Sequence, residues 1–115
     1  MSKITIDSDF IPPSVNNLFI NVPGRGRLPS KAYKAWRDKA GWDYNGLGSV
    51  SGRYSMVITL DRTLVRKNSD ISNRIKAVED LCVTHKLVDD DSQCDSLTIA
   101  YGECPKAMRV VIEAV

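Results

Sequence analysis

Four stretches of alternating apolar and polar residues predict the β-strands of this protein. Residues 3–7 (KITID) and 54–61 (YSMVITLD) alternate in this way and are rich in β-branched side chains, which favour strands. Residues 95–103 and 107–115 show the same pattern near the C-terminus. Only a short turn separates these last two runs, so the sequence predicts that they form a hairpin.

Helical periodicity marks two other segments. Ser30 is a suitable N-cap for a helix over residues 31–42. The buried face of this helix is expected to carry Ala32, Trp36 and Ala40. A second helix is predicted from about Ser72 to Thr84. Its apolar stripe consists of Ile75, Val78, Leu81 and Cys82.

Proline, glycine and asparagine mark the connections between these elements. Residues 12–17 predict a turn, residues 22–30 (VPGRGRLPS) a flexible basic loop, and residues 44–52 and 86–93 further loops. The resulting order, β-α-β-α-β-β, predicts an α+β fold, a two-layer sandwich in which two helices pack on one face of a small mixed sheet. We expect residues 1–115 to form a single domain.

Composition narrows the class of protein. No apolar run is long enough to span a bilayer, and residues 1–10 lack a signal-peptide pattern, so we expect no membrane association and a cytoplasmic location. The three cysteines are scattered, which is typical of free thiols in a reducing compartment. We expect no zinc site, because the sequence has no C-x-x-C pair and a single histidine, His85.

The net charge is only +2, but its distribution is uneven. Basic side chains gather in two segments: Arg25, Arg27, Lys31, Lys34, Arg37 and Lys39 in the first, and Arg62, Arg66, Lys67, Arg74 and Lys76 in the second. Residues 77–95 then carry six acids, Glu79, Asp80, Asp89, Asp90, Asp91 and Asp95. This arrangement suits a metal-dependent enzyme that acts on a polyanion. The alternative is a solvated surface with charge in blocks.

Helical geometry places Ser72, Lys76 and Glu79 on one narrow stripe of the second helix. Asp70 lies just before that helix, and the loop that follows it could bring Asp90 or Asp91 back towards Asp70. Converging carboxylates repel one another, and Mg²⁺ would relieve this repulsion. The alternatives are structural: Asp70 as a helix cap, Lys76 and Asp80 as a surface pair, and residues 89–93 as a solvated turn.

Several spaced motifs resemble the RusA-type Holliday-junction resolvases, small nucleases of bacteria and their phages. The resemblance begins at PPSVNNLF (12–19), continues through the basic loop and first helix (24–38), and is most specific at residues 69–93. The family pattern there is Asp-x-Asp-Asn-x-x-Lys-x-x-x-Asp, followed by Asp-Asp-x-Gln. The matching positions are Asp70, Asn73, Lys76, Asp80, Asp90, Asp91 and Gln93.

The resemblance implies a homodimer that uses Mg²⁺ to make paired nicks in four-way junction DNA during recombination and repair, inside a bacterial host cell. The catalytic residues it implies are Asp70, Lys76 and Asp91. Asp70 and Asp91 would hold the metal, with Asp90 or Glu79 as a further ligand. The expected DNA-binding residues are Arg25, Arg27, Lys31, Lys34, Arg62, Arg66, Lys67, Asn73 and Arg74. Phe19, Tyr33 or Trp36 could stack on an unpaired base, although Trp36 is expected in the core.

Ser72 departs from the family pattern, because the resemblance implies a carboxylate there. Either the protein binds junctions and has weak or lost cleavage, or another acid supplies the missing charge. Glu79 is the candidate, since it follows two turns later on the same predicted helical face. A third alternative is a small interaction protein with no role on nucleic acid.

Overall fold

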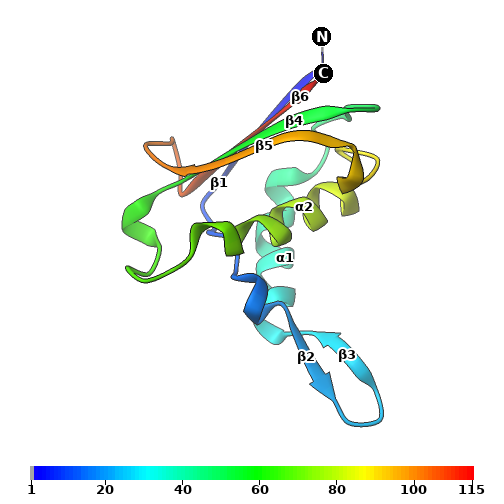
Figure 1. Cartoon of the computed structure of the whole chain (residues 1–115), viewed down its shortest axis with the longest axis vertical. Helices are drawn as coiled ribbons and strands as arrows, with labels where there is room; N and C mark the ends of the chain where they lie inside the picture. Colours follow the sequence, from blue (N-terminus) through cyan, green and yellow to red (C-terminus); the bar gives the residue numbers. More distant parts are fainter. Residues whose placement is uncertain (1) are drawn as a thin grey trace.

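The computed structural model describes residues 2–115 as a four-stranded mixed sheet, two helices packed against one of its faces, and a projecting two-stranded hairpin (Figure 1). The strands are β1 (Lys3–Ser8), β2 (Phe19–Val22), β3 (Gly26–Pro29), β4 (Tyr54–Leu60), β5 (Cys94–Tyr101) and β6 (Met108–Ala114). The helices are α1 (Lys31–Tyr44) and α2 (Ile75–Thr84). Short 3-10 turns are η1 (Val15–Asn17), η2 (Arg62–Leu64), η3 (Ile71–Arg74) and η4 (Asp91–Gln93). The predicted α+β class is confirmed.

The sheet has the order β1-β6-β4-β5, in which only the β4–β5 pair is parallel. The predicted hairpin between the last two strands is therefore wrong, because β4 lies between them. The chain leaves β5 and crosses the end of β4, where the Gly102 N–H donates to the Leu60 carbonyl (3.0 Å). Strand β6 is central because it pairs with β1 on one side and β4 on the other. Its alternate residues Met108, Val110 and Ile112 are fully buried.

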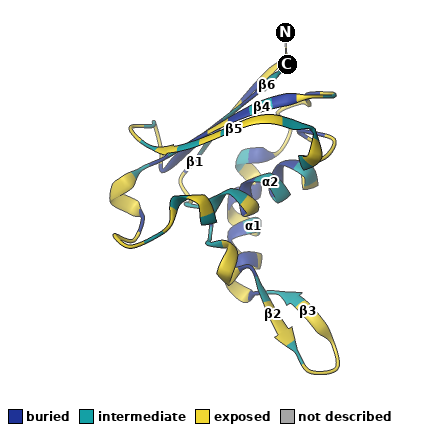
Figure 2. Ribbon diagram, in the orientation of Figure 1, coloured by how far each residue is buried: buried dark blue, intermediate teal, exposed yellow. Residues whose placement is uncertain are grey.

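Residues 19–29 form a β-hairpin where a flexible basic loop was predicted over 22–30. Phe19 pairs with Pro29 and Val22 pairs with Gly26, and the Arg25 N–H closes the turn on the Val22 carbonyl (3.0 Å). Gly24 has a φ of 76°, a left-handed conformation that glycine adopts without strain. The hairpin projects away from the sheet and is largely exposed (Figure 2).

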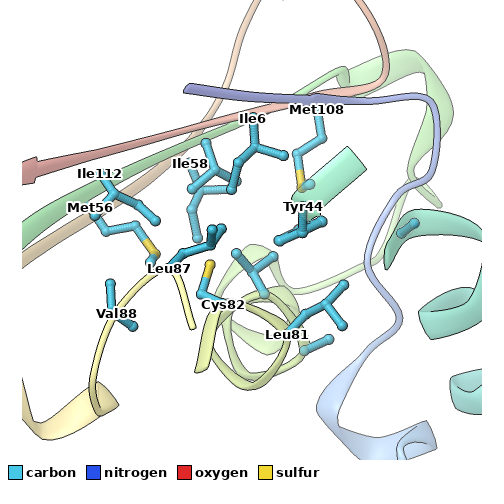
Figure 3. Close-up of a cluster of buried hydrophobic side chains, with 14 of the residues drawn as sticks. Ile6, Tyr44, Met56, Ile58, Leu81, Cys82, Leu87, Val88, Met108 and Ile112 are labelled. Atoms are coloured by element: carbon cyan, nitrogen blue, oxygen red, sulfur yellow. The ribbon is translucent and has the colours of Figure 1, made fainter. Parts of the chain in front are cut away.

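The core lies between the sheet and the two helices (Figure 3). Ser30 caps α1 as predicted, since its Oγ accepts from the Tyr33 N–H (3.0 Å). Trp36 and Ala40 lie on the buried face of α1, but Ala32 is exposed, which corrects the prediction. Tyr33 takes the core position beside the cap, and the larger aromatic ring gains more from burial than a methyl group would.

Helix α2 begins three residues later than predicted, because residues 71–74 form the 3-10 turn η3. Three hydrogen bonds from the Arg74 guanidinium fix this turn: two to the Ser69 Oγ (2.9 and 3.3 Å) and one to the Pro12 carbonyl (2.9 Å). Of the predicted apolar stripe, Val78, Leu81 and Cys82 are buried and Ile75 is half-buried.

The end of α2 is a sharp reversal of the chain. Lys86 has a φ of 58°, and the Leu87 N–H donates to the Cys82 carbonyl (2.9 Å). This is the hydrogen-bond pattern of a left-handed helix terminus. Leu87 and Val88 consequently enter the core, so the first part of the predicted loop 86–93 is firmly anchored.

All three cysteines are free thiols, as predicted. Burial raises the pKa of the Cys82 thiol to about 12, which keeps it protonated and makes it a packing residue. In the part of the chain that the structure describes, neither helix has the length and apolar character needed to cross a bilayer.

Candidate functional site

Lys76 on α2 is held between two carboxylates. Its ammonium lies 3.1 Å from Asp80, one turn along the same helix, and 3.5 Å from Asp91, in the turn η4. The contact with Asp80 raises the pKa of Lys76, and the charge of Asp91 adds to this effect. The ammonium therefore stays charged, and the Asp80 pair is more than a simple i,i+4 surface contact because it is joined to Asp91.

Glu79 belongs to the same cluster. It is half-buried on α2, and burial followed by the negative charge of Asp91 raises the pKa of its carboxyl group. Lys76 opposes this effect, whereas Asp80 adds to it. Lys76, Glu79, Asp80 and Asp91 are hereafter called the lysine cluster. Three carboxylates and one ammonium leave this cluster with an excess of negative charge.

Asp91 reaches the lysine cluster because the chain reverses at Lys86 and then forms η4. The Asp90 carboxylate caps that turn, accepting hydrogen bonds from the Ser92 N–H (3.2 Å) and from the Ser92 hydroxyl. These bonds lower the pKa of Asp90. The predicted metal ligand Asp90 thus has a local structural role, and Asp91 is the acid that points to Lys76.

Asp70 lies apart from the lysine cluster. It precedes η3, is exposed, and its carboxylate makes no cap hydrogen bond. Within residues 2–115 no ion pair joins Asp70 to a basic side chain. Asp70 thus occupies the N-cap position of η3, as one interpretation predicted, but its carboxylate does not cap the turn and is free to meet a ligand.

Asp70 faces a groove of about 1080 Å³ between the base of the hairpin and residues 66–74. One wall carries Asn16, Asn17, Phe19 and Ile20, and the other carries Arg66, Lys67, Asn68, Ser69, Asp70, Asn73 and Arg74. Positive charge, amide groups and apolar surface thus line one open channel. A phosphodiester strand, which combines anionic phosphates with flat apolar bases, has matching chemistry.

The predicted DNA-binding residues differ in whether their side chains already have partners within the protein. The Arg62 guanidinium donates to the Lys67 carbonyl (2.9 Å) and lies over the ring of Tyr101 (4.7 Å). Arg74 is tied to Ser69 and Pro12, as described above. Both arginines therefore brace the wall of the groove, whereas Arg66 and Lys67 are exposed and face it.

The first basic segment is split between the hairpin and α1. Arg25 and Arg27 are exposed on the hairpin, where Arg27 lies over the ring of Phe19 at 4.5 Å. Lys31 and Lys34 are exposed in the first turn of α1. These residues belong to the elements that form the hairpin side of the groove, so a bound polyanion could extend towards them.

Of the three aromatic residues considered for base stacking, only Phe19 lies in the groove. Trp36 is buried, as predicted, and Tyr33 is buried with it. The Tyr33 hydroxyl donates to the Asp80 carboxylate (3.4 Å), and burial followed by the charge of Asp80 raises the pKa of Tyr33. This link between α1 and the lysine cluster was missed, since 47 residues separate the partners and no sequence pattern connects them.

The carboxylates were tested as Mg²⁺ ligands. In residues 2–115 no group of three or more His, Cys, Asp or Glu side chains is arranged to hold a metal ion. However, Mg²⁺ in enzymes that act on phosphates is commonly held by one or two carboxylates together with substrate oxygens. Glu79 and Asp91 are two such carboxylates. Burial, and then the negative charge of Asp91, raises the pKa of Glu79, and a bound cation would favour its ionised form.

Ser72 lies on η3 and is exposed. A 3-10 turn has three residues per turn, so Ser72 is not in phase with Lys76 and Glu79 as a continuous α-helix would have placed it.

A scan of the chain against models of known protein families finds no match, and no curated protein matches it.

Proposed function

We propose that this protein is a Mg²⁺-dependent endonuclease that resolves four-way DNA junctions by paired symmetric nicks, as the resemblance to the RusA-type resolvases implies. The observation that carries the proposal is the position of the lysine cluster. Lys76 lies 3.1 Å from Asp80 and 3.5 Å from Asp91, and it is only two residues from Arg74, which lines the groove.

The groove supplies the DNA-binding part of the proposal. Arg66 and Lys67 would contact backbone phosphates, which fixes the position of the DNA without reading its sequence. Asn73 lines the same wall and could donate its amide N–H to a phosphate or base oxygen. Phe19 offers the exposed part of its ring to an unpaired base at the crossover.

Lys76 has two roles in this proposal. In the free protein its ammonium offsets the charge of Asp80 and Asp91, which keeps the carboxylates close together. With DNA bound, the same ammonium could donate to a phosphate oxygen and stabilise the charge that develops during hydrolysis. Tyr33 holds Asp80, and Asp80 in turn orients Lys76.

Glu79 and Asp91 are the residues that would hold Mg²⁺, and Asp70 would approach from the groove side. When bound, Mg²⁺ would supply positive charge for the phosphate oxygens and make water a better nucleophile at neutral pH. Glu79 then takes the place of the carboxylate missing at Ser72. A Glu79→Gln variant that keeps full Mg²⁺-dependent cleavage would overturn this assignment.

The decisive experiment is cleavage of a synthetic mobile four-way junction and of a matched linear duplex, with Mg²⁺ and with EDTA. We expect paired nicks in the junction alone, and none in EDTA. Asp91→Asn should lower the cleavage rate by at least about a hundredfold, the order found when a charge-stabilising group is lost. Asp95→Asn is the matched control, because Asp95 pairs with Arg53 on the surface and lies outside the lysine cluster.

A second candidate is a protein that holds junctions without cutting them. Ser72 favours it, because a hydroxyl replaces a carboxylate that the resemblance implies. Junction binding without nicks in Mg²⁺, with affinity that falls steeply as salt rises, would support this candidate. The absence of any junction affinity would exclude both candidates.

A further inference from the structure

The Tyr54 hydroxyl is a polar group that the fold buries without a partner. Tyr54 is the first residue of β4, and it is fully buried on the same side of the sheet as Met56 and Ile58, which point into the core (Figure 3). Its hydroxyl makes no hydrogen bond within residues 2–115. Removal of a phenolic O–H from water without an acceptor costs free energy, so the position of this group needs an explanation.

The register of the sheet places Tyr54 beside the lysine cluster. Tyr54 pairs with Cys94, the first residue of β5. The Cys94 N–H in turn donates to the Asp91 carbonyl and so ends η4, the turn that carries Asp91. Burial raises the pKa of Tyr54, and neighbouring acidic groups raise it further; in decreasing order they are Cys94, Glu79, Cys82 and Asp91. Two of these four neighbours are the carboxylates proposed to hold Mg²⁺.

Glu79 is the neighbour that best suits this hydroxyl as an acceptor. The Cys94 thiol is a weak acceptor, and its own proton is donated to the Ser96 carbonyl (3.3 Å). Asp91 already has the Lys76 ammonium at 3.5 Å.

The Glu79 carboxylate itself lacks a donor. It is half-buried on α2, and within residues 2–115 it forms no ion pair and accepts no hydrogen bond that would lower its pKa. A donor without an acceptor, Tyr54, and an acceptor without a donor, Glu79, thus lie on the sheet and on the helix that packs against it. Each supplies what the other lacks.

We propose that Tyr54 is a positioning residue for Glu79, and that its hydroxyl donates a hydrogen bond to the Glu79 carboxylate when that carboxylate holds a divalent cation. This inference rests on the proposed function, in which Glu79 is a metal ligand. Carboxylates that bind metals are themselves commonly held by hydrogen bonds, and loss of such a donor weakens metal binding about 10- to 100-fold. A carboxylate has two oxygens, so one can accept from Tyr54 while the other faces the cation.

The test is Mg²⁺ binding by the whole chain without DNA, followed through the amide chemical shifts of α2 and η4 in an NMR titration. Tyr54→Phe keeps the ring and removes only the donor, so it should weaken Mg²⁺ binding about 10- to 100-fold. In EDTA the same variant should resist urea as well as the parent chain or better, since an unpaired buried hydroxyl is removed. Equal Mg²⁺ affinity in Tyr54→Phe and the parent chain would overturn the inference.

Tyr101→Phe is the matched control. The Tyr101 hydroxyl is also buried without a hydrogen-bond partner in the described part of the chain. However, Tyr101 ends β5, at the opposite end of that strand from Cys94, and its ring lies under the Arg62 guanidinium. Its substitution should therefore leave Mg²⁺ affinity unchanged, and a loss equal to that of Tyr54→Phe would mean that any such tyrosine affects the site through packing.

A double-mutant cycle shows whether Tyr54 acts through Glu79. Glu79→Ala removes the proposed acceptor, so in that background Tyr54→Phe should change Mg²⁺ affinity by no more than about twofold, the ordinary scatter of independent substitutions. A tenfold loss that persists in the Glu79→Ala background would show that Tyr54 supports another ligand and would overturn the inference.

Junction cleavage by the parent chain separates this inference from the proposed function. A parent chain that nicks junctions, while Tyr54→Phe binds Mg²⁺ as tightly as the parent, would overturn the inference alone. Mg²⁺ binding that depends on Tyr54 and Glu79, in a chain that nicks no junction, would overturn the nuclease alone. A parent chain in which Mg²⁺ shifts no amide of α2 or η4 would overturn the inference, whatever the outcome with DNA.

Discussion

The lysine cluster and the groove around Asp70 hold their acids in opposite ways. In the lysine cluster, Asp80 and Asp91 lie within 3.5 Å of the Lys76 ammonium, and the charge is offset inside the protein. Asp70 has basic neighbours along the groove, Arg66 and Lys67, but forms no ion pair within the described chain. Acids that one sequence motif places together are thus separated into two that pair with Lys76 and one, Asp70, that forms no ion pair among the described residues.

The difference shows what a charge pattern can and cannot indicate. Carboxylates repel, so in the absence of a cation each acid settles beside the nearest positive group. Lys76 provides that group for Asp91, whereas Arg74, which follows Asp70 on η3, donates its hydrogen bonds to Ser69 and Pro12. Under the proposed function, bound Mg²⁺ and a DNA phosphate would bring Asp70 and the lysine cluster to one site.

Asp70→Asn tests whether Asp70 and the lysine cluster act together in cleavage, and it has the largest expected effect. Removal of this charge from a basic groove should strengthen junction binding in EDTA several-fold, because a repulsive group near the phosphates is lost. In Mg²⁺, cleavage should fall by about a hundredfold, as for Asp91→Asn. The two readouts are a gel-shift titration and a nicking assay. Normal cleavage by Asp70→Asn would mean that the lysine cluster acts without the groove acid.

Lys76→Met tests the lysine cluster by removal of its one positive charge. We expect cleavage to fall by about ten- to a hundredfold, since Lys76 would no longer stabilise charge on the phosphate. Stability should fall by only about 0.2–1 kcal/mol, because the ion pairs are largely exposed. Urea denaturation separates the two effects, and Lys39→Met, on the exposed side of α1, is the matched control. A variant that loses several times more stability would show that Lys76 is chiefly structural.

Lys67→Ala tests the groove as a phosphate-binding surface. Loss of one phosphate contact should weaken binding similarly for all junction sequences and should reduce the slope of log affinity against log salt by about 1. Lys106→Ala provides the comparison, since Lys106 lies in the turn between β5 and β6, away from the groove. Equal slopes for Lys67→Ala and the parent chain would place the DNA elsewhere.

The effect of Glu79→Gln on stability is the smallest of the expected effects, and it tests the electrostatic description independently of cleavage. Burial and the charge of Asp91 raise the pKa of Glu79, so the folded state disfavours its ionised form. The contribution of Glu79 to stability is therefore fully present below the ordinary glutamate pKa and is lost as pH rises through the raised pKa. We expect Glu79→Gln to be more stable than the parent chain near about pH 7, and the difference to vanish near about pH 4.

Thermal denaturation across this pH range measures the difference. Glu103→Gln, in the exposed connection after β5, is the control and should show no such pH dependence. A Glu79→Gln variant that is less stable at neutral pH would mean that the charged carboxylate is held by attractive contacts, which contradicts the direction of its pKa shift.

The sequence by itself determined the local elements. The alternation of apolar and polar residues predicted β1, β4, β5 and β6, because successive side chains of a strand point to opposite faces of the sheet and only one face is buried. Ser30 fixed the start of α1, since its hydroxyl can satisfy a backbone N–H at the first turn. The i,i+4 spacing of Lys76 and Asp80 gave their contact without any tertiary information.

Only the tertiary structure decided the rest. The position of β6 between β1 and β4 depends on how the strands pack in three dimensions. The short connection between β5 and β6 suggested a hairpin, but it is equally compatible with a strand that crosses over β4. The hairpin β2–β3 was obscured because each strand has only 4 residues and β3 (GRLP) contains glycine and proline, which are rare in strands. The contacts of Asp91 with Lys76 and of Tyr33 with Asp80 join distant segments, so they follow from packing of the elements and not from spacing along the chain.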